Sequence, residues 1–346
     1  METLWFALVA GMLAMYVVFD GFDLGAGIVH LVVARDEPER RRVLQTIGPV
    51  WDGNEVWLLA AGGTLYFAFP RLYASSFSGF YLPLMMVLWL FMLRGLAIEF
   101  RHHFDNAVWK PFWDVVFSAA SALLAVFFGA ALGNVVRGVP LDADARFFLP
   151  LWTDWRPGAT PGILDWYTVL VGVGALVALT AHGAWWVAHK TDGDVQARAR
   201  RAAGATWWGL AVFTVLVTLV TFQVQPQVPA RLTAAPWGLV FPVVAVAGLG
   251  LMWHYGRRRA DRPAFLASCG YLVGMLTSVA FGVYPFVLPS NVDASRSLDI
   301  YNAAAGAYGL RVGLAWFIPG MLLVTAYFVF TYRRLAGKTV VDEEGY

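Results

Sequence analysis

The sequence predicts an all-α membrane protein, a polytopic helical bundle of about nine transmembrane helices. Hydrophobic residues make up 59% of the 346 residues and charged residues only 14%, whereas about 25% of the residues in soluble domains are charged. The mean hydropathy of +0.61 agrees with this composition. Because one membrane helix needs about 20 mostly apolar residues, the spans require nearly the whole chain, and residues 1–346 are expected to form a single membrane domain.

Nine apolar runs define the expected helices. They lie at roughly 4–34, 50–69, 77–99, 113–136, 163–188, 204–223, 237–255, 264–288 and 309–332. No basic residue precedes the first run, and it continues well past Ala10 without a small-residue cleavage site. It is therefore interpreted as a retained helix rather than a signal peptide. The run at 50–69 is the weakest, because it starts with charged residues and is rich in glycine.

Basic residues predict the orientation of the bundle. Loops after odd-numbered helices contain 17 of the 25 Lys and Arg residues, loops after even-numbered helices contain 7, and Arg94 lies within the third helix. The positive-inside rule places the richer side in the cytoplasm. The N-terminus is then outside and the C-terminus cytoplasmic. One span more or fewer would mix the two groups of loops, so the charge distribution also favours nine spans.

Net charge and cysteine content argue against other classes of function. The net charge of +2 gives no indication of a nucleic-acid partner. The only cysteine is Cys269, which excludes an intrachain disulfide and a Cys-ligated cluster.

Two aspartates lie within the first predicted helix, where a carboxylate costs about 2.5–3.5 kcal/mol on insertion scales. Asp20 and Asp23 are three residues apart, so they lie on nearly the same helix face. Gly21, Gly25 and Gly27 beside them are expected to allow close approach of another helix. The pair is either a polar clamp between helices or part of a route for protons.

A second pair of acids, Asp52 and Glu55, begins the second predicted helix. Trp51, Asn54 and Trp57 flank the pair. One acid at a helix N-terminus is explained by the helix dipole, but a pair at the cytoplasmic water boundary can also accept protons.

The third predicted helix contains Arg94 and, near its end, Glu99. Arg94 is expected to extend towards water or to pair with an acid, with Asp20 or Asp52 as specific candidates. In the predicted orientation, all three groups lie in the cytoplasmic half of the first three helices. They predict a polar zone of acids without local counter-charges that faces the cytoplasm.

Histidines provide little indication of a haem site. The six are His30, His102, His103, His182, His189 and His254. A haem ligand in a membrane bundle projects from within a helix, and only His182 lies well inside a predicted span. It is interpreted as a hydrogen-bonded packing residue. No metal-ligand spacing is present.

Several motifs resemble the second subunit of cytochrome bd-type quinol oxidases. The two longest are Asp20-Gly21-Phe22-Asp23-Leu24-Gly25 and Trp51-Asp52-Gly53-Asn54-Glu55-Val56-Trp57-Leu58, the latter followed by Ala61-Gly62-Gly63. Shorter matches are Phe77-Ser78-Gly79-Phe80-Tyr81, Arg94, Gly133-Asn134, Pro285-Phe286-Val287-Leu288-Pro289-Ser290 and the tail Glu343-Glu344-Gly345-Tyr346 after Arg333-Arg334. The matches cover the whole chain in order.

The resemblance implies a bacterial inner-membrane complex that oxidises quinol and reduces dioxygen to water, with protons taken from the cytoplasm and without pumping. Haems b and d would be ligated by subunit I, with none in this chain. Small accessory subunits, lipids and quinone are further partners that the resemblance allows, and either ubiquinol or menaquinol fits. In the family, the residue matching Asp52 is placed at the entrance of the proton path, while some relatives have Gln at the position of Glu55.

Site residues are therefore expected in two groups, with no catalytic residue and no metal ligand. The proton pathway would comprise Asp52, Glu55, Asp20 and Asp23. Polar support would come from Arg94, Glu99 and Asn54. Two alternatives stay open at this point: a proton-coupled secondary transporter, which would purify without haem colour, and a purely structural subunit.

Overall fold

The computed structural model describes residues 1–339 and consists mainly of long helices. The helices are α1 (Glu2–Val33), α2 (Glu37–Gln45), α3 (Trp51–Ala68), α4 (Pro70–Gly79), α5 (Tyr81–Phe100), α6 (Trp109–Arg137), α7 (Trp166–Lys190), α8 (Gly193–Val224), α9 (Gln227–Ala234), α10 (Val240–Arg257), α11 (Asp261–Val283) and α12 (Ala307–Arg334). Two short 3-10 helices, Pro236–Leu239 and Ala294–Arg296, and a small antiparallel pair of strands, β1 (Phe286–Leu288) and β2 (Leu298–Asp299), complete the described chain. The acidic tail motif at 343–346 lies outside the described residues.

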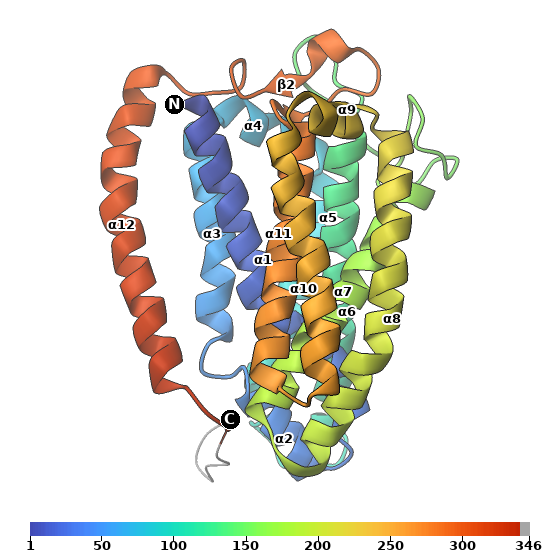
Figure 1. The fold of residues 1–346 in the computed structure, drawn as a ribbon, viewed down its shortest axis with the longest axis vertical. Helices are drawn as coiled ribbons and strands as arrows, with labels where there is room; N and C mark the ends of the chain where they lie inside the picture. Colours follow the sequence, from blue (N-terminus) through green and yellow to red (C-terminus); the bar gives the residue numbers. More distant parts are fainter. Residues whose placement is uncertain (340–346) are drawn as a thin grey trace.

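The long helices run roughly along one axis, as Figure 1 shows. The N-terminus, α4, α9 and β2 lie at one end of the bundle, whereas α2 and the described C-terminal end lie at the other. Within residues 1–339, eight helices are long and apolar enough to cross a membrane. The helical membrane fold is therefore confirmed. The ninth span, which would be α3 with its 18 residues and two acids, and the orientation of the termini stay predictions.

Helix ends differ from the hydropathy boundaries where polar residues continue or interrupt a helix. The run predicted at 204–223 belongs to a helix that begins at Gly193, because its first turns are amphipathic and rich in arginine. The run predicted at 77–99 begins its long helix only at Tyr81, after the separate helix α4. The run predicted at 264–288 ends as a helix at Val283, and the following residues form β1.

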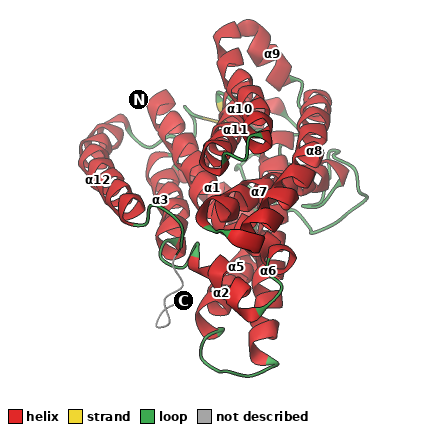
Figure 2. Cartoon of the chain, turned by 60° about the horizontal axis from the view of Figure 1, so that its bottom comes forward, coloured by secondary structure: helices red, strands yellow, loops and turns green. Residues whose placement is uncertain are grey.

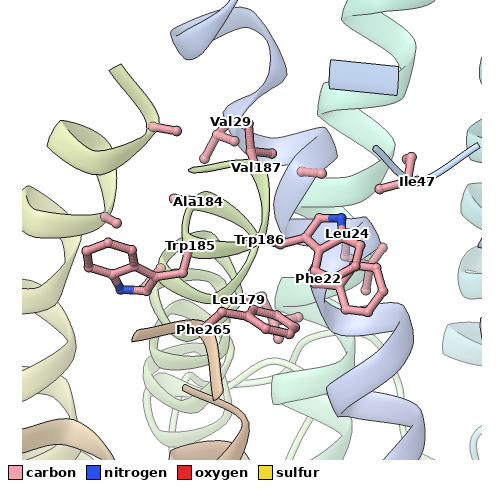
Figure 3. Packing of buried hydrophobic residues seen from close by; sticks show 14 of the residues in the cluster. Phe22, Leu24, Val29, Ile47, Leu179, Ala184, Trp185, Trp186, Val187 and Phe265 are labelled. Atoms are coloured by element: carbon pink, nitrogen blue, oxygen red, sulfur yellow. The ribbon is translucent and has the colours of Figure 1, made fainter. Parts of the chain in front are cut away.

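The core lies between α1, α6, α7 and α11. Each long helix contains a most apolar stretch of 18 residues, and the buried share of that stretch differs between helices. It is 56% in α7 and 44% in α1, but only 6% in α8 and zero in α12. Figure 3 shows the aromatic centre of this core, where Phe22 stacks on Trp186 at 4.1 Å between ring centroids. By contrast, α12 lies at the edge of the bundle, on the side of α3 and α1 (Figures 1 and 2).

Glycines let α1 pack closely against α7 and α6, as the sequence predicts. A Cβ atom on Gly25 would collide with the carbonyl of Leu179 and the backbone of Gly183 in α7. A Cβ atom on Gly27 would collide with Ser121 in α6. This close packing fixes the position of the helix turn that carries Asp20 and Asp23.

Candidate functional site

Asp20 is held in a buried ion pair with Arg94. Arg94 of α5 donates two hydrogen bonds to the Asp20 carboxylate, from Nη2 to Oδ1 at 2.6 Å and from Nη1 to Oδ2 at 3.0 Å. The Tyr16 hydroxyl donates a third at 2.8 Å. Both charged side chains are fully buried. Bidentate pairs of this kind combine strong bonds with a fixed geometry, so Asp20 has a full set of partners.

Glu55 of α3 lies on the other side of the same guanidinium. Its Oε1 is 2.8 Å from Nη2 of Arg94, and its side chain is 27% exposed. Arg94 thus joins α1, α5 and α3, and two carboxylates share one cation. Glu55 is the member of this group that reaches the surface of the chain.

Asp23 has a different environment, although it is one turn from Asp20. Asn54 of α3 donates from Nδ2 to Oδ2 of Asp23 at 2.7 Å. The hydroxyl of Tyr332, on α12, donates to Oδ1 of Asn54 at 2.8 Å. Asp23 is buried, and its Oδ1 has no hydrogen-bond partner among the described residues. A buried acid with one open oxygen and no contacting cation is the arrangement expected of a group that binds and releases a proton.

Asp52 lies at the surface, next to this buried group. It is exposed, and its Oδ1 accepts a hydrogen bond from the backbone N–H of Gly53 at 2.7 Å. Asp52, Asn54, Thr331 and Tyr332 line a small hollow of about 10 Å³ between the start of α3 and the end of α12. The hollow connects an exposed carboxylate to the two residues that lead to Asp23.

The structure brings together most of the residues that the sequence singles out. Asp20, Asp23, Glu55, Arg94 and Asn54 form one cluster, whereas Glu99 is exposed in the last turn of α5.

The expectation that these acids have no counter-charges is wrong for two of them. Arg94 is long enough to reach from α5 to both Asp20 and Glu55. Of the two partners suggested for Arg94, the structure selects Asp20, in a bidentate pair.

Two tyrosines of the site were not found from the sequence. Tyr16 lies four residues before Asp20 on the same helix, so the helical spacing could have indicated it. Tyr332 comes from the far end of the chain, 278 residues from Asn54. No local pattern links those two positions.

A second buried ionic cluster joins α1, α5 and α6 near α2. Asp114 accepts hydrogen bonds from Nε2 of His30 at 2.7 Å and from Nε of Arg101 at 2.6 Å. Arg101 also binds Glu37 through both of its terminal nitrogens. Partial burial of Glu37 opposes its ionisation, but the hydrogen bonds and charge of Arg101 outweigh this effect, so the pKa of Glu37 lies below its ordinary value. The cluster therefore ties α2 and α6 to the end of α5.

His182 is fixed by hydrogen bonds on both ring nitrogens. Nδ1 lies 2.7 Å from the Ser268 hydroxyl and Nε2 lies 2.9 Å from the carbonyl of Val18. The ring also stacks on Phe265. A haem iron could bind His182 only if one of these bonds were broken. Residues 1–339 also contain no group of three or more His, Cys, Asp or Glu side chains suited to a metal ion.

Comparisons with known proteins agree with this arrangement. The family model for cytochrome bd terminal oxidase subunit II matches residues 1–335. The chain is 31% identical to the probable cytochrome oxidase subunit 2 of Haemophilus influenzae, over 97% of this chain and 94% of that protein. It is 30% identical to the cytochrome bd ubiquinol oxidase subunit 2 of Bacillus subtilis, over 96% of each chain.

A solved structure shares the fold. The structure of the bd oxidase from Geobacillus thermodenitrificans contains a chain that matches with a TM-score of 0.76 and 17% identity, over 97% of this chain and 98% of that one. Together with the match to the family model along nearly the whole sequence, these findings show that the chain belongs to the cytochrome bd terminal oxidase subunit II family.

Proposed function

We propose that this chain is the proton-delivering subunit of a bd-type quinol oxidase. As a member of the subunit II family it is a multi-pass membrane subunit of a terminal oxidase, and its complex is a quinol oxidase that includes a subunit I. In the proposal, the complex passes electrons from quinol to dioxygen and forms water. It contributes to the proton-motive force because the protons come from the cytoplasm, without pumping.

Haems b and d of the complex would be ligated by subunit I. The reason is the arrangement around His182, whose two ring nitrogens are already hydrogen-bonded within the chain. The haems would carry the electrons, and the contribution of this chain would be to bind and move protons and to pack against its partner.

One observation carries the proposal: exposed Asp52 and Asn54 line the same hollow, and Asn54 is hydrogen-bonded to the buried acid Asp23. Reduction of dioxygen to water consumes protons in an apolar environment, so a path from the aqueous surface is needed. Asp52 would take up protons at the surface, and Asp23 would receive them beyond Asn54. Glu55 reaches the surface of the chain beside Arg94. A partly exposed carboxylate on the face of a membrane helix is costly in lipid, which favours this face for contact with subunit I.

The remaining residues of the cluster would have different roles. Arg94 would hold the charge of Asp20 and orient Glu55. Asn54 would position Asp23. Glu99 would have no part in the path, because it lies at the end of α5, outside the cluster around Arg94.

The test is Asp52→Asn in the assembled complex. Asn keeps the size of the side chain and an oxygen that can accept from Gly53, but it cannot bind a proton at neutral pH. We expect slower oxygen consumption with unchanged haem content. The matched control is Asp105→Asn, which changes an almost fully exposed aspartate on a loop. Turnover equal to that of the wild type would remove Asp52 from the path. Loss of haem or of assembly would instead support a structural role.

A further inference from the structure

The last turn of α12 reaches into the polar cluster, although the rest of this helix is on the outside. Its outward side chains are exposed, among them Trp316 at 78% and Leu323 at 72%. At its end, however, the ring of Tyr332 packs against Phe19 and Phe328, and its hydroxyl points at Asn54. The end of α12 thus forms one wall of the hollow beside Asp52.

Hydrogen bonds fix the chain immediately after Tyr332. The Lys190 ammonium of α7 donates to the carbonyls of Leu335 and Gly337 at 2.5 and 2.9 Å. Lys338 donates to the carbonyl of Ala188 at 3.0 Å. These bonds tie the end of an otherwise peripheral helix to α7, and they hold the Tyr332 hydroxyl beside Asn54.

The two aspartates of α1 differ in their contacts with the cation of the cluster. Both oxygens of Asp20 are bonded to Arg94, and one of them also to Tyr16. Asp23 accepts one bond, from a neutral amide, and its other oxygen is open. The cluster contains three carboxylates and one guanidinium, and the guanidinium contacts only Asp20 and Glu55 among them. A buried carboxylate without a cation is strongly disfavoured, so Asp23 is the acid that binds a proton at rest.

We propose that Tyr332 is a positioning residue for proton transfer and that Asp23, not Asp20, is the buried acid that carries the proton. This inference rests on the proposed function. The Tyr332 hydroxyl fixes the Asn54 amide, whose N–H holds Oδ2 of Asp23 and leaves Oδ1 as the oxygen that takes the proton. A proton delivered from the side of the hollow breaks its bond to the donor water and forms an O–H bond at Oδ1. The same bond breaks when the proton leaves towards its next acceptor, and no electron is transferred.

The first experiment compares Tyr332→Phe with Tyr308→Phe in the purified complex. Tyr332→Phe keeps the ring and its packing but removes the hydroxyl. Tyr308 lies on the same helix and is 83% exposed, so Tyr308→Phe controls for a change in α12. We expect Tyr332→Phe to slow oxygen consumption per haem by about tenfold, the effect of one hydrogen bond on a rate. We also expect a larger ratio of rates in H₂O and D₂O, and the rate and ratio of the wild type for Tyr308→Phe.

A purely structural role of Tyr332 would give a different result. Tyr332→Phe would then lower the thermal stability and haem content of the complex but leave the rate per haem and the isotope ratio unchanged. That outcome would overturn the proposal. If Asp52→Asn slows turnover and Tyr332→Phe does not, proton uptake at Asp52 stands and the route through Tyr332 is wrong. If both leave turnover unchanged, the proposed function fails as well.

The second experiment examines Asp23 directly. The infrared difference spectrum between the wild type and Asp23→Asn at neutral pH should contain the carbonyl band of a protonated carboxyl group, shifted in D₂O. A carboxylate band in its place would show that Asp23 is charged at rest and would overturn its assignment. This readout does not depend on turnover, so it separates the protonation of Asp23 from any effect of the variant on assembly.

Discussion

Replacing Arg94 by Gln should be the most damaging single change in the cluster. The variant leaves the Asp20 carboxylate fully buried with one of its three hydrogen bonds, the one from Tyr16. Glu55 loses its cation at the same time. Removing one partner of a buried ion pair costs about 3–5 kcal/mol, because the other charge stays behind unpaired. At about 1.4 kcal/mol per factor of ten, the ratio of folded to unfolded protein falls by roughly two to four orders of magnitude.

The assay is thermal unfolding of the purified complex, followed by tryptophan fluorescence and haem absorbance, together with the yield of assembled complex. A second variant, Arg94→Gln with Asp20→Asn, tests the cause. It removes both charges of the bidentate pair, so it should recover a large part of the lost stability. The reasoning is refuted if Arg94→Gln unfolds at the temperature of the wild type, or if the double variant is no more stable than the single one.

Three further changes test the surrounding structure. Gly25→Ala should destabilise the bundle by about 1–3 kcal/mol, because the added methyl group meets the backbone of α7. The control is Gly62→Ala, where the added methyl group meets open space. Equal melting temperatures of the two variants would contradict this account. The pKa of Glu37 is lowered from 4.5 by its pair with Arg101, so its contribution to stability is complete above pH 4.5 and disappears as the pH falls through the lower folded value. Glu37→Gln should therefore make the stability fall less steeply as the pH is lowered. If the stability of the variant depends on acidic pH as that of the wild type does, the pair of Glu37 with Arg101 does not contribute to stability. His182→Gln should leave the haem-to-protein ratio of the assembled complex unchanged, and the loss of a haem band would identify His182 as a ligand after all.

Hydropathy and charge predicted the helical membrane fold because both are properties of continuous stretches of sequence. Spans of about 20 apolar residues are visible without any knowledge of packing. The start of α8 was missed because Gly193 and the arginine-rich turns that follow are polar and lie before the apolar stretch. A helix can extend beyond the apolar region where its backbone hydrogen bonds continue, and hydropathy does not record these bonds.

The site could be predicted only in part, because its contacts join helices that are distant in the sequence. The acids Asp20 and Asp23 could be found because a charge inside an apolar run is conspicuous in a single sequence. Arg94 was predicted to pair with Asp20 or Asp52, but the choice between them depends on how α5 lies against α1. Asp114 was missed because it falls at the edge of an apolar run, where an acid is unremarkable until the fold buries it.

In the proposed route, one turn of α1 holds both a fixed charge, on Asp20, and a mobile proton, on Asp23. Two acids three residues apart lie on one face of α1, but Asp20 meets Arg94 of α5 while Asp23 meets Asn54 of α3. The ion pair fixes α5 against α1, and Glu55 extends the same contact to α3. Because Asn54 and Glu55 are neighbours on α3, the ion pair also holds the amide that positions Asp23. Loss of Arg94 should therefore affect assembly first, whereas loss of the Asp23 carboxyl should affect turnover in a complex that still assembles.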